Sequence, residues 1–515
     1  MISYSPKRIA KNTIILFVRM LLVMIISLFT TRIILLSLGI DDYGIFSVVG
    51  GVVSLFAFIT IPLISSTQRF LNYEIGQNNY KKVIDVFNAS LIIFSILTIL
   101  LFILFETIGY YFIIHYLVVP TGRLAAAIWV YHFTIASFCL YILSTPFQAL
   151  LAAYEDMASI AIVEMGQGIA KLGIAYLIIY TSYDKLESYA VLLFCISFMS
   201  LLSYFIFYRI KHSNIRLARV NDKTLYKELS FFAGWNLFES TSGILQAFGT
   251  TILLNLFYGT IINAAYGVAR QVNSAVSAFS INYMRAATPQ ITQSYSSNDR
   301  EYSIKLVFYS SKISYFSFWV IVIPFLIEMD WVLSIWLKVV PEYSSIFCRL
   351  MIIETLLNSI SFPLSTFIFA SGKIKIYQIV TGGLTLLNLP LSLFILKMGY
   401  YPYSVMTISI IISILCLISR LKILNIVMQF PIRSFYNNVL LKITKITVLS
   451  LIFPMLIFYY LDKGWPRFII VCIISIITSI CAIYLLGITE TERQFFKNII
   501  SVYFKKIKLK RHYCQ

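Results

Sequence analysis

Charged residues are scarce in this chain. Only 12% of its 515 residues are Asp, Glu, Lys or Arg, whereas 59% are hydrophobic, and a soluble domain carries about 25% charged residues. A soluble protein of this length needs more polar surface than the sequence supplies. The composition therefore excludes a soluble globular protein.

Motifs of reactive residues are also missing. The seven cysteines form no CxxC or Cys/His cluster, and the four histidines are scattered along the chain, so we expect neither a disulfide framework nor a metal site. We find no paired-carboxylate or nucleophile–base motif either. The sequence therefore predicts a protein that is not an enzyme and that holds no cofactor.

What the chain does have is a series of long hydrophobic runs. Many reach about 20 residues, which is the length that an α-helix needs to cross the hydrocarbon core of a bilayer. We predict an all-α polytopic membrane protein with about 14 transmembrane helices. The approximate spans are 13–36, 44–64, 86–106, 124–148, 159–180, 188–208, 230–257, 262–284, 306–327, 345–369, 376–396, 402–419, 446–461 and 468–487.

The basic residues orient these spans. With the N-terminus in the cytoplasm, most of the 41 Lys and Arg residues fall in cytoplasmic segments, as the positive-inside rule requires. We therefore expect both termini to be cytoplasmic. The loop at 149–158 is the exception, because its only charged residues are Glu155 and Asp156. The formal net charge of +19 reflects this bias and a basic tail that can contact anionic lipid, so it implies no nucleic-acid partner.

A short pattern occurs twice. Tyr43-Gly44 returns as Tyr266-Gly267, and VIDVFNAS at 83–90 returns as IKLVFYSS at 304–311. This layout predicts a parallel repeat of the kind found in transporters, and we interpret each Tyr-Gly as a turn with an interfacial Tyr anchor. The predicted parts are two six-helix lobes at 1–223 and 224–430, two additional helices at 431–488 and a basic cytoplasmic tail at 489–515.

Polar residues form three stripes inside the predicted spans. Such residues are costly in a membrane and usually face a bundle interior or a wet cavity, so we interpret the stripes as walls of a central aqueous cavity. The alternative is that Glu164 with Lys171, and Glu239 with a basic partner, are structural buried pairs. The stripes are Glu164, Gln167 and Lys171; Asn236, Glu239 and Gln246; and Arg270 and Asn273.

Two arginines of the first span need separate treatment. Arg19 and Arg32 lie roughly 140° apart on a straight helix, so both face one cavity only if the helix is kinked or mobile. Basic residues outnumber acidic residues within the spans. A cavity with excess positive charge suits an anionic substrate, and arginine matches phosphate or pyrophosphate.

Several stretches resemble one family of membrane proteins. They are KNTIILFVRMLL with the following TTRIILLSLGIDDYGIFSVVGGVV, STQRFLNYEIGQ at 66–77, AYGVARQVNSAV and ATPQITQSY. In these stretches the chain resembles a polysaccharide flippase of the multidrug/oligosaccharidyl-lipid/polysaccharide exporter superfamily, and the likeness covers the first twelve spans. The last two spans resemble the additional helices of the related lipid II flippases.

The resemblance implies a function. It implies a multi-pass protein of the bacterial inner membrane that moves undecaprenyl-pyrophosphate-linked oligosaccharide repeat units, such as O-antigen units, from the inner to the outer leaflet by alternating access. Membrane lipid and this substrate are the implied partners, with glycan polymerase and other pathway proteins as further candidates.

Within that frame we assign roles to the striped residues. Arg270 and Lys171 would hold the pyrophosphate, with Arg19 and Arg32 at the two ends of the path, and Glu164 or Glu239 would couple H⁺ or Na⁺ to lobe closure. The sugar would contact Asn236, Gln246, Asn273 and Gln167.

Two other functions remain open at this point. A multidrug antiporter of the same superfamily shares the fold, but it should have a lone acid in an uncharged or acidic cavity. A membrane enzyme of lipid-linked glycan assembly also fits a hydrophobic chain, although such enzymes generally carry a sizeable periplasmic loop and the predicted outside loops are short. Those loops contain only six basic residues: Arg123, Lys185, Lys338, Lys397, Lys463 and Arg467.

Overall fold

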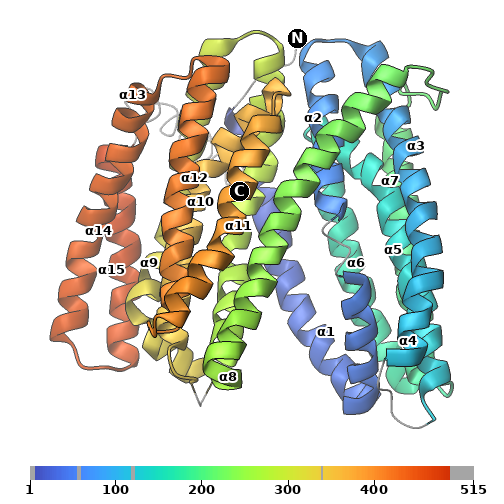
Figure 1. Ribbon diagram of the computed structural model, residues 1–515, viewed down its shortest axis with the longest axis horizontal. Helices are drawn as coiled ribbons and strands as arrows, with labels where there is room; N and C mark the ends of the chain where they lie inside the picture. Colours follow the sequence, from blue (N-terminus) through green and yellow to red (C-terminus); the bar gives the residue numbers. More distant parts are fainter. Residues whose placement is uncertain (1–5, 55–58, 117–121, 338–339, 488–515) are drawn as a thin grey trace, which may run out of the picture. The chain divides into compact units, whose positions relative to one another are not determined.

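The chain is an all-helical polytopic membrane protein (Figure 1). The computed structural model describes residues 6–54, 59–116, 122–337 and 340–487, and the predicted tail at 489–515 lies outside them. The α-helices are α1 (Pro6–Ser54), α2 (Thr60–Gly76), α3 (Tyr80–Leu104), α4 (Tyr110–Tyr116), α5 (Leu124–Ala153), α6 (Met157–Leu177), α7 (Lys185–Lys211), α8 (Lys223–Ser296), α9 (Arg300–Leu337), α10 (Ser344–Ser371), α11 (Lys375–Lys397), α12 (Ser404–Met428), α13 (Ile432–Phe435), α14 (Leu441–Tyr460) and α15 (Trp465–Ala482).

Twelve helices of the described residues are long and apolar enough to cross a membrane. The 74-residue α8 accounts for two of the predicted spans, because its backbone leaves the helical conformation at Gly259. The predicted span at 44–64 runs over the end of α1, over residues 55–58, which lie outside the described part, and into α2. These two differences explain why fourteen predicted spans correspond to twelve helices.

Two glycines break their helices in the same way. Gly39 in α1 has φ 81° and ψ 174°, and Gly259 in α8 has φ 77° and ψ −167°. Only glycine adopts this backbone region without a large penalty. Each glycine precedes one copy of the Tyr-Gly pattern, so the turn is made by these glycines, whereas Gly44 and Gly267 lie within helix. Our interpretation of Tyr-Gly as the turn itself was wrong by a few residues.

The left-handed residues of the connecting turns also come in pairs. Asn78 follows α2 with φ 56°, and Asn298 follows α8 with φ 61°. Glu155 lies between α5 and α6 with φ 59°, and Gly372 lies between α10 and α11 with φ 76°. Equivalent places in the predicted repeat thus share a left-handed backbone, with the same residue type in the first pair and different types in the second.

Contacts divide the chain into two compact units. Unit 1 consists of the described residues of Met1–Phe248, Ile281–Ile304 and Ser365–Leu387, and unit 2 of those of Gly249–Ser280, Lys305–Leu364 and Asn388–Gln515. Helix α8 therefore contributes both ends to unit 1 and its middle to unit 2. The lobe boundaries at residues 223 and 430 stay a prediction.

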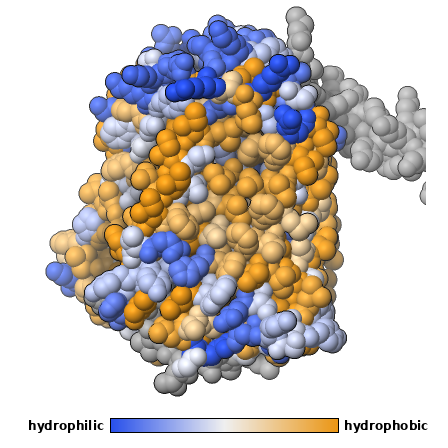
Figure 2. Space-filling view, turned by 90° about the vertical axis from the view of Figure 1, so that its right-hand side faces the viewer, coloured by the Kyte–Doolittle hydropathy of each residue, from blue (hydrophilic) through white to orange (hydrophobic). Residues whose placement is uncertain are grey.

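Unit 1 has an apolar core and an apolar exterior. The fully buried Tyr131 on α5 donates its hydroxyl hydrogen to the carbonyl of Phe105 at 2.5 Å. On α3, large apolar side chains such as Ile96, Ile99 and Leu100 are more than half exposed. Figure 2 shows hydrophobic side chains over the middle of one face and hydrophilic ones toward its two ends. Such a surface suits a bilayer, where lipid covers the apolar side chains.

In unit 2, the last two long helices pack on α9. The indole nitrogen of Trp319 donates to the hydroxyl of Ser450 at 2.9 Å, and the hydroxyls of Tyr315 and Thr447 lie 2.8 Å apart. These contacts join α14 to α9 through polar atoms buried inside the unit. The predicted additional helices are therefore packed parts of the fold.

Candidate functional site

A pocket of about 430 Å³ lies within unit 1 between α1, α6 and α7. The α6 stripe supplies one wall, because Glu164, Gln167 and Lys171 recur at i, i+3 and i+7 and so share one helix face. Arg19 enters from α1. We call this site the cationic pocket, since Arg19 and Lys171 outnumber its single acid, Glu164. The rest of the lining is part apolar and part hydroxyl-bearing, the hydroxyls belonging to Ser27, Thr30, Thr31, Tyr43 and Tyr189.

Arg19 is held by two groups, and the acid that it pairs with also meets a second arginine. One guanidinium nitrogen pairs with the carboxylate of Glu164, and the other donates to the side-chain oxygen of Asn282 at 2.8 Å. Arg285 approaches the second oxygen of the same carboxylate at 3.5 Å. Asn282 and Arg285 belong to the last part of α8, which lies in unit 1. The ion pair thus connects α1, α6 and the end of α8.

Lys171 has a different environment. Its side chain is exposed in the cationic pocket, and it makes no hydrogen bond or ion pair with the part of the chain that the structure describes. The sequence offered Glu164 with Lys171 as a structural pair, and this alternative was wrong because Glu164 pairs with Arg19. Lys171 is therefore the unneutralised positive charge of the pocket.

Gln167 and Arg32 complete the first part of the predicted site. The Gln167 amide donates to the hydroxyl of Ser200 on α7, so Gln167 ties α6 to α7 at the back of the cationic pocket. Arg32 is exposed on α1 and does not line that pocket. This separation of Arg19 and Arg32 follows from their angular spacing along the helix.

The second stripe lies on α8 and does not line the cationic pocket. Asn236 is 4% exposed, and its side-chain oxygen accepts a hydrogen bond of 2.5 Å from Gln378 on α11. Glu239 and Gln246 are half-buried. Asn236 is therefore held inside unit 1 by a protein partner.

The third stripe belongs to unit 2. Arg270 is exposed, one turn after the buried Tyr266, and the side-chain oxygen of Asn273 accepts a hydrogen bond of 2.8 Å from Thr355 on α10. Within unit 1 the structure brings together Arg19, Glu164, Gln167 and Lys171. The shared role of these residues with Arg270 and Asn273 stays a prediction.

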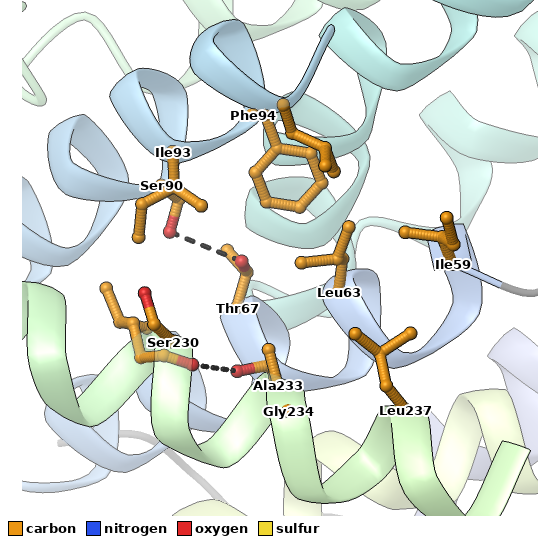
Figure 3. Close-up of a pocket in the computed structure, with 13 residues that line it drawn as sticks. Ile59, Leu63, Thr67, Ser90, Ile93, Phe94, Ser230, Ala233, Gly234 and Leu237 are labelled. Carbon is orange, nitrogen blue, oxygen red and sulfur yellow. Dashed lines mark hydrogen bonds between the residues drawn. The ribbon is translucent and has the colours of Figure 1, made fainter. Parts of the chain in front are cut away.

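A second pocket in unit 1 has a different character. It measures about 170 Å³ and lies between α2, α3 and the first part of α8 (Figure 3). Its walls are mostly apolar side chains such as Leu63 and Phe94, and the hydroxyl of Thr67 donates a 3.2 Å hydrogen bond to that of Ser90. None of its lining residues is charged. This pocket does not suit an ionic group.

The turn between α5 and α6 holds a buried acid that the sequence did not reveal as functional. The Glu155 side chain is 2% exposed, and Arg8 lies 3.1 Å from its carboxylate. Gln290 donates to the same carboxylate at 3.0 Å, and Gln293 donates to the carbonyl of Ala153 at 2.7 Å. We call these residues the Glu155 network. The loop at 149–158 was the exception to the distribution of basic residues, and its buried acid Glu155 is neutralised by Arg8 from another segment.

A second network surrounds the turn between α10 and α11. Arg69 on α2 donates to the carbonyls of Phe369 and Ala370, each at 3.0 Å. These carbonyls belong to the residues three and two positions before the left-handed Gly372, and a Cβ on that glycine would lie 2.7 Å from an Arg69 nitrogen. We call this set the Gly372 network.

The two networks have the same plan. In the Glu155 network, side chains at the end of α8, in the second predicted lobe, bind the α5–α6 turn of the first. In the Gly372 network, Arg69 near the end of α2, in the first predicted lobe, binds the α10–α11 turn of the second. Both networks lie within unit 1. Arg69, Gln290 and Gln293 come from STQRFLNYEIGQ and ATPQITQSY, which the sequence marked only by resemblance. Long polar residues at the predicted cytoplasmic ends of spans were the available signal.

Two acids of the α5–α6 turn have shifted pKa values. Burial raises the pKa of Glu155 above its ordinary range, although the hydrogen bond from Gln290 and the charge of Arg8 lower it in part. Burial also raises the pKa of Asp156, but hydrogen bonds from Lys211 and Ser159 outweigh it and leave that pKa below its ordinary range. The pKa values of these two neighbours are therefore shifted in opposite directions.

The sequence matches no family model and no curated protein, so solved structures provide the comparison. A MATE in complex with MaD3S has a TM-score of 0.69 at 13% identity over 82% of this chain and 97% of that one. The fold is that of the MATE transporters.

Two further MATE-like structures match as well. An outward-facing multidrug resistance MATE family transporter of the MOP superfamily has a TM-score of 0.66 at 14% identity, covering 79% of this chain and 93% of that one. A MOP superfamily transporter from Pyrococcus furiosus, whose reversed pocket polarity is said to suggest a different function, has a TM-score of 0.63 at 14% identity, covering 80% and 94%. The cationic pocket therefore lies within a fold of the MATE type.

Proposed function

We propose that this protein is a membrane transporter whose substrate carries an anionic head group. The observation behind the proposal is the unneutralised Lys171 beside Arg19 in the cationic pocket. Phosphate and pyrophosphate bind such groups through charge-assisted hydrogen bonds. The best-fitting member of this class is an undecaprenyl-pyrophosphate-linked oligosaccharide, moved from the inner to the outer leaflet of the bacterial inner membrane.

Alternating access supplies the mechanism that we propose. The Glu155 and Gly372 networks would close the cytoplasmic ends of the helices in one state and open in the other. Glu164 would contribute to coupling, because a proton or Na⁺ that neutralises it releases Arg19 to bind the substrate. The remaining predicted residues keep their separate roles. Glu239 would couple the ion, Arg270 would hold the pyrophosphate and Arg32 would lie at one end of the path. The sugar would contact Gln246 and Asn273.

A multidrug antiporter is the second candidate. The solved structures favour it over the flippase, because they are MATE transporters and one is described as a multidrug resistance protein. The charge of the pocket argues for an anionic substrate instead, since a drug cation would be repelled by Lys171. The protein from Pyrococcus furiosus supports the idea that pocket polarity can vary within this fold.

Paired assays would separate the two candidates. A null strain for repeat-unit flipping, complemented with this protein, should regain surface polysaccharide, whereas a drug-sensitive host should not become resistant to cationic drugs. Resistance without polysaccharide export would instead support the antiporter. If Arg270→Ala and Lys171→Ala both transport normally, the cationic-cavity mechanism fails.

A membrane enzyme of glycan assembly is the least supported function. The similar solved structures are transporters, and the described connections between the long helices are short. Partnership with a glycan polymerase remains part of the flippase proposal and is tested by co-purification from a strain that makes the polysaccharide.

A further inference from the structure

One carboxylate of unit 1 lies between two arginines. The two oxygens of Glu164 meet different guanidinium groups: one oxygen pairs with Arg19, and the other lies 3.5 Å from Arg285. The three side chains come from α6, α1 and the last part of α8. Because each oxygen meets its own arginine, the carboxylate bridges the two positive charges.

Two arginines that share one anion form the kind of arrangement that also binds phosphate. A guanidinium presents its N–H donors as a planar fork, and the oxygens of a carboxylate or of a phosphate fit this fork in the same way. The pair Arg19 and Arg285 with the single acid Glu164 keeps one net positive charge. A diphosphate has more oxygens and more negative charge than a carboxylate, so it matches two arginines better than Glu164 does.

Arg19 is also held by a group other than the carboxylate. The side-chain oxygen of Asn282 accepts a 2.8 Å hydrogen bond from the Arg19 guanidinium, and the amide nitrogen of Asn282 lies 3.1 Å from the sulfur of Met20. Asn282 is 4% exposed, so its own position is fixed by packing. Arg19 would therefore keep its place if the Glu164 carboxylate moved away.

A ligand can reach this carboxylate. Glu164 and Arg19 line the cationic pocket, and the Arg285 side chain is 46% exposed. Glu164 comes seven residues after α6 begins at Met157, which is roughly 10 Å along the helix. One leaflet contributes about 15 Å of hydrocarbon, so the two arginines lie within the predicted cytoplasmic half of the membrane.

We propose that Glu164 is a built-in substitute for the anionic head group of the substrate. Before substrate binds, its carboxylate fills a two-arginine site made by Arg19 and Arg285, and an entering diphosphate displaces it. Arg285 is then a further substrate-binding residue, at the cytoplasmic end of the path. The proposal rests on the proposed function, because it takes an anionic head group as the ligand, and it adds that the protein carries its own competitor for that ligand.

Displacement would also link substrate binding to ion coupling. Glu164 loses both arginine partners when the diphosphate takes its place, and an unpaired carboxylate inside a membrane is costly. Uptake of a proton or Na⁺ by Glu164 removes that cost. Because such coupling is reciprocal, a bound ion on Glu164 would in turn favour the anion between Arg19 and Arg285.

Binding of inorganic pyrophosphate to the purified full-length protein tests the proposal without any transport. Glu164→Gln should bind it about tenfold more tightly than wild type, because the amide oxygen still accepts from Arg19 but carries no competing charge. Glu164→Asp should also bind it more tightly, since the shorter acid keeps its charge but cannot reach both arginines. Glu106→Gln is the control, because it removes an acid of unit 1 that pairs elsewhere, with His132. Isothermal titration calorimetry measures each affinity.

Arg285 has its own variant. In the Glu164→Gln protein, Arg285→Gln should weaken pyrophosphate binding about tenfold. Arg219→Gln, which removes an exposed charge from the connection between α7 and α8, should leave it unchanged.

Three results would overturn the proposal. Equal affinity of wild type and Glu164→Gln would show that the acid does not compete with the anion, while the proposed function would stand. Unchanged affinity after Arg285→Gln would remove the second arginine from the site. If neither wild type nor Glu164→Gln binds pyrophosphate, the anionic substrate of the proposed function fails as well.

Discussion

The side-chain amide of Gln290 donates a 3.0 Å hydrogen bond to the carboxylate of Glu155, a residue 135 positions earlier in the chain. The two residues come from different predicted lobes, at 1–223 and 224–430. A buried carboxylate is stable only when it is paired or hydrogen-bonded. The closed arrangement of the Glu155 network therefore depends on the end of α8 staying beside the α5–α6 turn.

This network should respond to pH. The folded pKa of Glu155 is raised by burial, so the closed form binds more protons than an open form in which Glu155 meets water. The contribution of Glu155 to closure is therefore complete below its ordinary pKa of 4.5 and is lost as the pH rises from that value through the raised pKa.

Thermal unfolding measures this effect when wild type is compared with Glu155→Gln across that pH range. The wild-type midpoint, relative to that of the variant, should fall as the pH rises, because glutamine does not titrate. Each unit of difference in pKa between the folded and the unfolded state corresponds to about 1.4 kcal/mol in the free energy of unfolding. A constant difference between the two proteins would contradict the predicted role of Glu155.

The close packing of α2 on the end of α8 predicts a second effect. A Cβ at Gly76 would lie 1.8 Å from the Ser296 hydroxyl and 2.5 Å from the carbonyl oxygen of Gln293. Gly76→Ala should therefore force the two helices apart, at a cost of about 1–3 kcal/mol typical of overpacking. Gly383→Ala in α11 is the matched control, since nothing lies within 4 Å of its Cβ.

Cross-linking between cysteines introduced near residues 76 and 296 would report the separation directly. Gly76→Ala should lower the cross-linking yield and slow transport, whereas Gly383→Ala should change neither. Unchanged cross-linking in Gly76→Ala would contradict this prediction, because the backbone would then accommodate the methyl group without separating α2 from α8.

The ion pair in the cationic pocket predicts a rescue. Arg19→Ala leaves Glu164 with only the more distant Arg285, at 3.5 Å. Removal of one partner from a buried pair costs about 3 kcal/mol or more, and both side chains here are less than one fifth exposed. The double variant Arg19→Ala/Glu164→Gln should regain much of the thermal stability that Arg19→Ala loses.

The same variants separate stability from transport. If Arg19 binds the substrate or Glu164 couples the ion, the double variant should stay inactive although it is stable again. Recovery of transport together with stability would mean that Arg19 serves only to neutralise Glu164.

Lys171 allows a test of substrate charge. Lys171→Glu should abolish transport of an anionic substrate, and Lys171→Arg should retain it, because only the latter keeps the positive charge. The expected loss is at least tenfold, since removing one charge-assisted hydrogen bond costs about 1.5–3 kcal/mol. Uptake by inverted vesicles measures this loss of transport. A gain of cationic-drug export in Lys171→Glu would indicate that the charge at this position decides whether the fold accepts anions or cations.

The sequence predicted the helices and one wall of the pocket well. Hydrophobic runs predict spans because the bilayer fixes their length, and the i, i+3, i+7 spacing placed Glu164, Gln167 and Lys171 on one face without any knowledge of the fold. The break at Gly39 was not recognised, because a glycine between apolar residues has no local signal that separates a turn from a helix position.

The partners across helices were beyond the reach of the sequence. The pairing of Arg19 with Asn282, and of Gln290 with Glu155, depends on which helices pack together, and periodicity within one helix carries no such information. The alternative pair of Glu164 with Lys171 failed for this reason. It was favoured by proximity along the chain, while the true partner of Glu164 comes from α1.

Gly39 and Gly259 bear on the history of the molecule. A side chain at either position would meet open space, so sterics with neighbouring helices place no demand on them, but their backbone conformation excludes other residues at a cost of about 1–3 kcal/mol. Mutation can therefore alter almost every residue around them and still leave these two in place. If the two halves arose by duplication of one ancestral gene, these two glycines should be among the last positions at which the halves still match.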